Sequence, residues 1–279
     1  MDPFELPRVM ENPGLLFLVG ASALLYARGV ASLWHEAGFG RGIRPAESIR
    51  FGLAWLALAA ALLSPLDHLA ERSFGMHMVQ HELLMVVAAP LFVLGRPLEA
   101  WSWAIPVAMT KALSGIARNG AVRVVWRWIT EPVGAWCVHA AALWTWHLPS
   151  FFVAALENPV LHVLQHASFF ASALLFWWSV FGRGRRPEAI ALASLFTTML
   201  HTSVLGALIT FAPSPWYVRD GAPTLFGLSP LEDQQVGGLV MWVPGGFAYL
   251  AAGIAIVARW LATEPPPPRR RTADLPARP

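Results

Sequence analysis

Long apolar stretches constrain the fold of this chain more than any other feature. A helix needs about 20 mostly apolar residues to cross roughly 30 Å of hydrocarbon. Only 13% of the 279 residues are charged, whereas soluble domains carry about 25%. We therefore expect an all-α, polytopic membrane helix bundle that forms a single domain over residues 1–263. About seven transmembrane helices are predicted, at 14–34, 47–66, 74–95, 132–149, 158–181, 188–212 and 236–261.

Basic residues indicate which way the bundle faces. Cytoplasmic connections of membrane proteins are enriched in Lys and Arg. We therefore predict a multi-pass membrane protein with its N-terminus out and its C-terminus in. The outer side then keeps Arg8, Arg72 and Arg219. Sixteen basic residues lie on the inner side: Arg41, Arg44, Arg50, Arg96, Lys111, Arg118, Arg123, Arg127, Arg183, Arg185, Arg186, Arg259, Arg269, Arg270, Arg271 and Arg278.

Two segments are predicted to lie outside the hydrocarbon. Over about 98–118, apolar residues recur at helical spacing with charges between them, which is typical of an amphipathic helix on the membrane surface. Residues 264–279 hold four consecutive prolines and an arginine triplet, and we predict a disordered cytoplasmic tail there. Because the basic residues follow a membrane pattern, the pI near 9.6 does not indicate nucleic-acid binding.

Histidines gather in the outer half of the predicted bundle. His77 and His81 lie four residues apart on one predicted span, and His162 and His166 lie four apart on another. Residues at this spacing share a helix face. At 1.5 Å per residue, both pairs lie roughly 5 to 10 Å below the outer surface. His147 ends the fourth span at about the same depth, so the pattern predicts a metal site.

The residue types around these histidines favour copper. Ionisable residues inside a membrane are costly and usually mark a function, and His201 lies deeper, near the middle of the sixth span. Imidazole together with thioether favours copper over magnesium or calcium. Met78 follows His77 and Met199 precedes His201 in the sequence, so both are predicted helpers. Asp233 lies near the outer end and is a third helper that would orient a histidine.

A structural alternative stays open for each of these residues. A single membrane histidine is more often a hydrogen-bonded helix contact than a ligand, and apolar helices use methionine freely for packing. The only cysteine, Cys137, excludes an internal disulfide and a multi-cysteine metal site. No P-loop, dinucleotide fingerprint or nucleophile elbow is present in the sequence. We therefore predict that the protein is not an enzyme and has no catalytic residues.

Four segments carry a resemblance to a known family. They are HMVQHELLMVVAAPLFVLGRP (77–97), WHLPSFFVAALENPVLHVLQHASFF (146–170), HTSVLGALITFAPSPWY (201–217) and LSPLEDQQVGGLVMWVPGG (228–246). Here the chain resembles the CtaG family of cytochrome c oxidase assembly factors, membrane proteins associated with aa-type oxidases. The family's acidic-glutamine motif falls on Asp233 and Gln234, and Gln165 stands where the family often has an acidic residue. The family's histidine motifs fall on His77, His81, His147, His162, His166 and His201.

The resemblance implies a role in the maturation of a copper-containing cytochrome c oxidase, and with it a place in the bacterial inner (cytoplasmic) membrane. Copper would be bound or delivered through the outer histidine cluster, and the partners would be oxidase subunits, a periplasmic copper chaperone and the lipid bilayer. Three alternatives stay open. A haem-binding membrane redox protein would use facing imidazoles as axial ligands. A copper transporter would carry the metal across the membrane, and a scaffold would dock oxidase helices without binding metal.

Overall fold

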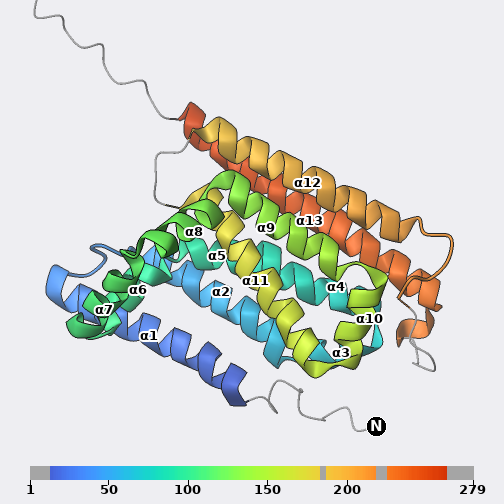
Figure 1. Ribbon diagram of the computed structural model, residues 1–279, viewed down its shortest axis with the longest axis horizontal. Coiled ribbons are helices and arrows are strands. Elements are labelled where there is room, and N and C mark those ends of the chain that lie inside the picture. The colour runs from blue at the N-terminus through green and yellow to red at the C-terminus, as the bar shows by residue number, and fades with distance from the viewer. Residues whose placement is uncertain (1–12, 183–186, 218–224, 263–279) are drawn as a thin grey trace, which may run out of the picture.

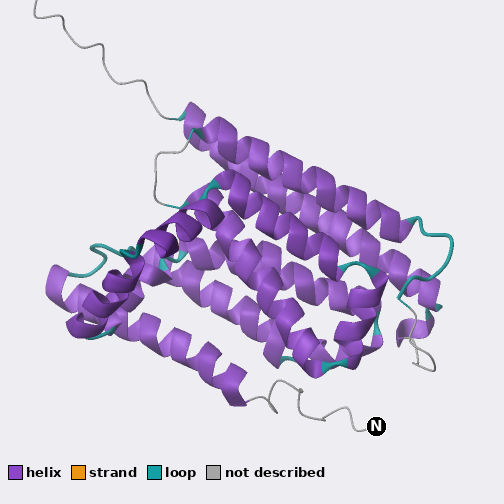
Figure 2. Cartoon of the chain, in the orientation of Figure 1, coloured by secondary structure: helices purple, strands orange, loops and turns teal. Residues whose placement is uncertain are grey.

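The computed structural model describes residues 13–182, 187–217 and 225–262 (Figure 1). Within these ranges every regular element is helical (Figure 2), which confirms the predicted all-α class. The predicted tail, 264–279, lies outside the described residues. The elements are α1 (Pro13–Ala37), α2 (Pro45–Leu63), α3 (Leu66–Arg72), α4 (Phe74–Glu82), the π-helix η2 (Leu83–Ala88), α5 (Ala89–Leu94), α6 (Pro97–Ala104), α7 (Val107–Ala117), α8 (Gly120–Thr130), α9 (Pro132–Trp146), α10 (Pro149–Glu157), α11 (Pro159–Phe181), α12 (Glu188–Thr210), the 3₁₀ turn η3 (Leu225–Gly227) and α13 (Pro230–Leu261).

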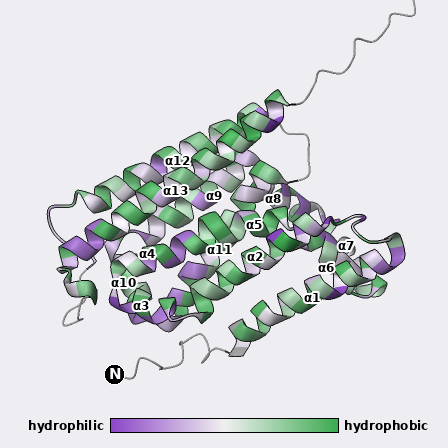
Figure 3. Ribbon diagram, turned by 180° about the vertical axis from the view of Figure 1, so that it is seen from behind, coloured by the Kyte–Doolittle hydropathy of each residue, from purple (hydrophilic) through white to green (hydrophobic). Residues whose placement is uncertain are grey.

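Six helical segments are long and apolar enough to cross a membrane. They lie in α1, α2, the continuous rod Phe74–Leu94 formed by α4, η2 and α5, α11, α12 and α13. Hydrophobic residues predominate along these helices (Figure 3), and side chains such as Phe17, Leu56, Phe196 and Phe247 are exposed. Apolar side chains on an exposed helix surface are expected where the surrounding medium is lipid. The chain is therefore a polytopic helical bundle, and six of its seven predicted spans meet this criterion.

The fourth predicted span, 132–149, is shorter than expected. Its helix α9 has 15 residues, which corresponds to about 22 Å at 1.5 Å per residue. The helix ends because Leu148 is extended (φ −65°, ψ 131°) and Pro149 begins α10; the residue before a proline is disfavoured in the helical region. Figure 1 shows α9 running from the end of the bundle that holds α8 to the end that holds α10. The chain therefore passes along the bundle as predicted, but in a helix below full spanning length.

The long connection between the third and fourth predicted spans forms three short helices. α6, α7 and α8 have 8, 11 and 11 residues, and all three lie at one end of the bundle (Figure 1). Instead of one amphipathic helix over 98–118, α6 and α7 are separated at Ile105, which is extended (φ −96°, ψ 150°) before Pro106. The helix α8 exposes Trp126 and Trp128, residues that favour the membrane interface. None of the three is long enough to span a bilayer.

The rod Phe74–Leu94 changes its winding directly after α4. In η2, the Ala89 N–H donates to the carbonyl of Leu84, five residues earlier. Pro90 follows and has no N–H to continue the usual ladder. The freed carbonyl of Met85 accepts a hydrogen bond from the Trp177 indole on α11 at 2.8 Å. This bond links the rod to α11 below the histidines, and single π-turns of this kind are frequent at functional sites.

Candidate metal centre

Two helices each bring a pair of histidines to the same end of the bundle. His77 and His81 are the fourth and eighth residues of α4, and their ring centroids lie 4.4 Å apart. His162 and His166 are the fourth and eighth residues of α11, and their ring centroids lie 4.3 Å apart. Each pair is separated by about one helical turn, so both imidazoles project from one face. The structure therefore brings together the two pairs that the sequence placed at matched depth.

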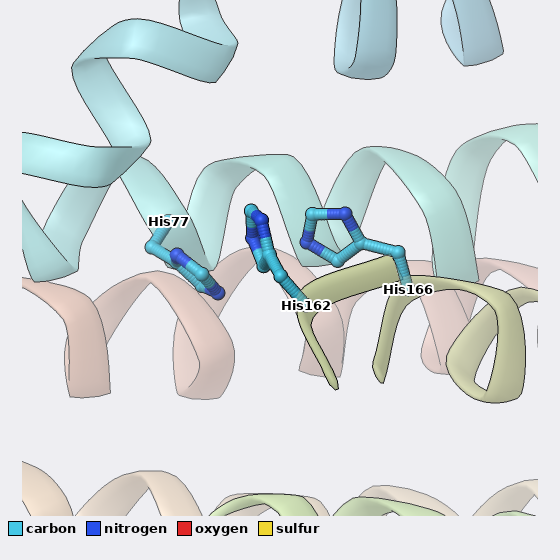
Figure 4. A group of neighbouring side chains, drawn as sticks. All are labelled: His77, His162 and His166. Atoms are coloured by element: carbon cyan, nitrogen blue, oxygen red, sulfur yellow. The ribbon is translucent and has the colours of Figure 1, made fainter. Parts of the chain in front are cut away.

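The two pairs face each other between α4 and α11. The His77 ring centroid lies 5.4 Å from that of His162 and 5.7 Å from that of His166, and His81 lies 5.2 Å from His166. One ring nitrogen each from His77, His162 and His166 lie within 4.8 Å of one another, and Figure 4 shows these three rings side by side. Nitrogens that bind one metal at about 2 Å lie at most about 4 Å apart. Small side-chain rotations would therefore allow all three to bind one ion.

His147 approaches this cluster from the end of α9. Its ring centroid lies 6.1 Å from that of His81. The Nδ1 atom of His147 lies 2.7 Å from the carbonyl oxygen of Leu143. A carbonyl can only accept, so Nδ1 carries the proton and Nε2 of the neutral ring presents a lone pair. This Nε2 is buried and has no hydrogen-bond partner among the described residues. An N–H bond to a carbonyl commonly orients a metal-binding histidine.

The interior of the cluster is rich in buried nitrogen lone pairs. His77 and His81 are 1% and 0% exposed. Both ring nitrogens of His81, together with Nε2 of His166, have no hydrogen-bond partner in the described part of the chain. A buried polar atom without a partner costs about 1 to 3 kcal/mol, and native proteins contain few of them. The arrangement therefore fits a set of metal ligands better than a set of hydrogen-bonded helix contacts.

Three of the residues predicted from the sequence lie elsewhere. His201 on α12 packs edge-on against Trp136 on α9, with centroids 5.4 Å apart, and within the described ranges no ring contact joins it to the five clustered histidines. Met78 is buried in an apolar cluster beside Phe152. Met199 packs against the main apolar core. The two thioethers therefore take part in packing, and the cluster consists of His77, His81, His147, His162 and His166.

Asp233 orients the helix that carries the first histidine pair. Its carboxylate accepts hydrogen bonds from Ser73 Oγ at 2.6 Å, from the Phe74 N–H at 2.7 Å and from the Gly75 N–H at 3.1 Å. The first N–H groups of a helix have no partner within the helix, and they favour a negative charge nearby. Asp233 on α13 thus fixes the start of α4, one turn before His77.

Three aromatic rings cover the cluster, and we call Phe74, Phe152 and Tyr217 the aromatic roof. Tyr217 stacks on Phe74 with centroids 4.5 Å apart and lies 4.7 Å from Phe152. Phe152 lies 5.0 Å from His77. Tyr217 Oη donates to the carbonyl of His147 at 2.8 Å, and burial raises the pKa of Tyr217, which keeps this group a donor. Phe152 therefore packs directly against His77, and Phe74 and Tyr217 pack behind Phe152.

Gln234 holds the segment that leads to Tyr217. Its Oε1 accepts a hydrogen bond from the Trp216 N–H at 2.6 Å, and its Nε2 donates to the carbonyl of Ile209 at 3.2 Å. One side chain on α13 thus joins the end of α12 to the chain that follows it. The acidic-glutamine pair therefore serves two tasks: Asp233 fixes α4, and Gln234 fixes the aromatic roof.

Further side chains complete the surroundings of the cluster. Gln165 is fully buried. Its position three residues after His162 puts it on the same face of α11, and this spacing was a usable signal. Phe152 had no comparable signal, because its place beside His77 depends on how α10 packs.

Comparison with known proteins adds one match. A family model described as cytochrome c oxidase caa3 assembly factor (Caa3_CtaG) matches residues 24–263, a range that includes all five clustered histidines and the aromatic roof. Neither the curated proteins nor the solved structures contain a match to the chain.

Proposed function

Since the chain belongs to the family of cytochrome c oxidase caa3 assembly factors, as the resemblance predicted, we propose that it binds cuprous copper for a maturing oxidase. His77, His162 and His166 would hold the ion, with His81 and His147 beside them. The protein would act as a non-enzymatic metal carrier in the bacterial cytoplasmic membrane. One observation carries the proposal: ring nitrogens of His77, His162 and His166 lie within 4.8 Å of one another.

The ligand types support copper as the cargo. Carboxylate and carbonyl oxygens suit magnesium and calcium, whereas imidazole suits copper and zinc. The nearby carboxylate of Asp233 is already bonded to the start of α4. A monovalent ion also brings less uncompensated charge into a buried site than a divalent one. Membership of an oxidase assembly family favours copper over zinc, because cytochrome c oxidase contains copper.

The arrangement of the five imidazoles supports transfer rather than permanent storage. Structural metal sites usually have a closed set of four ligands, and sites with an open position exchange more readily. The ring centroid of His81 lies 5.2 Å from that of His166, and the ring centroid of His147 lies 6.1 Å from that of His81. An ion held by three imidazoles therefore has further ligands within reach. It would move between them in steps, without a fully uncoordinated state.

Close contact between the imidazoles disfavours the haem alternative. Two axial histidines hold a haem from opposite faces of the porphyrin. In this cluster the rings of α4 and α11 contact each other directly, with centroids 5.4 Å apart for His77 and His162. A porphyrin inserted between the two helices would have to break these contacts between their imidazole rings.

Metal analysis of the purified protein tests the proposal. The protein, loaded anaerobically with cuprous ion and freed of excess, should retain copper. The variant His77→Phe/His166→Phe keeps ring volume but removes two ligands, and it should lose that copper. The matched control is His35→Phe, because the His35 side chain is 88% exposed on α1. Equal copper in all three proteins would overturn the assignment of the site.

A cellular experiment separates metal delivery from docking alone. A strain without this protein should contain oxidase polypeptide that lacks copper, and the unaltered gene should restore the metal. The His77→Phe/His166→Phe variant should not restore it, whereas His35→Phe should. Full restoration by the cluster variant would instead support a scaffold that docks oxidase helices without metal.

A further inference from the structure

The helix α8 is exposed on every side over most of its length. Residues 120–128 are all exposed, and only Ile129 and Thr130 at its end are partly or fully buried. Isolated helices shorter than about 12 residues are marginal in water, and α8 has 11 residues. Valine, isoleucine and threonine make up much of its sequence, GAVRVVWRWIT, and their branched side chains lower helix propensity further. The helix therefore depends on surroundings that cover its apolar side chains.

These apolar side chains form one stripe along α8. Val122, Val125, Trp126 and Ile129 recur at the spacing i, i+3, i+4 and i+7, which places them on one face of a helix. Together with Ala121 they line a hollow in the surface. Val125 and Trp126 are 59% and 53% exposed, so the described part of the chain leaves the stripe largely uncovered.

The side of α8 away from this stripe is basic. Arg123 and Arg127 lie four residues apart and therefore share a face, and both are exposed. Neither side chain forms an ion pair with another described residue. Residues 100–130, which include α7 and α8, contain four basic residues and no acidic one. The charge of this surface is therefore complementary to an anionic partner.

The position of α8 in the bundle indicates which partner it meets. With α6 and α7 it lies at the end of the bundle where the rod Phe74–Leu94 stops (Figure 1), and spanning helices end at the membrane surface. A Cβ at Gly134 would clash with the Trp128 carbonyl, so the end of α8 packs directly on the first turn of α9. A short helix held at this level, with an apolar stripe, tryptophan and arginine, has the composition of a helix that lies in the membrane interface.

We propose that α8 binds anionic phospholipids of the adjacent leaflet. Arg123 and Arg127 contact the phosphate headgroups, and the apolar stripe lies among the upper parts of the acyl chains. Basic residues at this depth favour lipids with a net negative charge over zwitterionic ones. In the predicted orientation the leaflet is the cytoplasmic one, which carries the anionic lipids. This lipid site goes beyond the proposed copper carrier, because none of the histidines takes part in it.

Spin labels at two neighbouring positions test how the helix lies. Each protein carries Cys137→Ser and one new cysteine, Val125→Cys or the control Val124→Cys, which is labelled with a nitroxide. The two valines are 59% and 56% exposed, but Val124 lies outside the stripe. In vesicles with equal amounts of phosphatidylglycerol and phosphatidylcholine, the Val125→Cys label should be reached better by oxygen and the Val124→Cys label by a water-soluble nickel complex. Equal access of the nickel complex to both labels would overturn the proposed placement.

Counting retained lipids tests the preference for anionic headgroups. The protein is released from nanodiscs of the same two lipids, and native mass spectrometry counts the bound molecules of each. The parent should retain phosphatidylglycerol over phosphatidylcholine, and Arg123→Gln/Arg127→Gln should reduce this preference by about fivefold or more. The control Arg28→Gln/Arg41→Gln removes the same charge from exposed positions elsewhere and should keep the preference.

Two further outcomes would contradict a lipid site at α8. Equal preference in all three proteins, or an equal loss in both arginine variants, would show that these two arginines do not select the headgroup. A Val125→Cys label that stays open to the nickel complex in vesicles, and is shielded only when oxidase is added, would assign the stripe to a protein partner instead.

Discussion

Replacing Asp233 by alanine should destabilise the bundle and disturb the metal centre together. The carboxylate accepts hydrogen bonds from Ser73 Oγ and from the first two N–H groups of α4. Loss of a helix cap costs about 1 kcal/mol. A buried hydroxyl and a buried amide left without partners add about 1 kcal/mol each. We therefore expect Asp233→Ala to lower the free energy of unfolding by about 3 kcal/mol, with Asp233→Asn in between because it keeps one acceptor oxygen.

The adjacent residue provides the control for this prediction. Glu232 is exposed and caps only its own helix, through the Ser229 N–H, so Glu232→Ala should have a much smaller effect. Unfolding in mixed detergent micelles measures the stability of each variant, and competition with a chelator measures its cuprous affinity. Asp233→Ala should lose both stability and affinity, because Asp233 binds Ser73 at the start of α4 and His77 lies four residues after Ser73. Equal stability of the two alanine variants would refute the idea that Asp233 fixes α4.

Three further variants, one of them with a matched control, probe the packing and the site. A Cβ at Gly238 would clash with a threonine hydroxyl of α12 and lie 2.7 Å from a backbone carbonyl of the same helix. Gly238→Ala should therefore lower the free energy of unfolding by about 2 kcal/mol or more. The control Gly246→Ala should be nearly neutral, because a Cβ at Gly246 meets nothing within 4 Å. Tyr217→Phe removes the bond to the His147 carbonyl and should cost about 1 kcal/mol, with faster copper release to a chelator in stopped-flow measurements. Gln165→Glu adds a carboxylate beside the cluster and should raise cuprous affinity about tenfold, or 1.4 kcal/mol; unchanged affinity would show that the side chain does not face the ion.

Local spacing explains why the two histidine pairs could be predicted. His77 and His81 share a helix face whatever the rest of the fold does, and the same holds for His162 and His166. Their equal depth follows from equal distances to the starts of α4 and α11. The copper ligand set and the orientation in the membrane stay predictions.

Helix rotation explains why the placement of His201 could not be predicted. On α12 its depth was clear from the sequence, but the neighbour that it meets depends on how α12 packs against α9. The structure turns it toward Trp136 on α9. Hydropathy is nearly uniform around such a helix, so it carries no information on the face that points inward.

The short fourth helix is the clearest case in which a difference from the sequence prediction bears on function. A helix continued to residue 149 would carry His147 onward along the axis of α9. Instead the chain leaves the helix at His147 (φ −91°, ψ 1°), and Pro149 starts α10 in a new direction. The turn brings the His147 ring to 6.1 Å from His81, and it brings Phe152 to 5.0 Å from His77. The same break that makes α9 too short to span the bilayer thus supplies the fifth imidazole and one ring of the aromatic roof. Changing Pro149 to alanine, which would let α9 extend, should therefore weaken copper binding more than it weakens the fold.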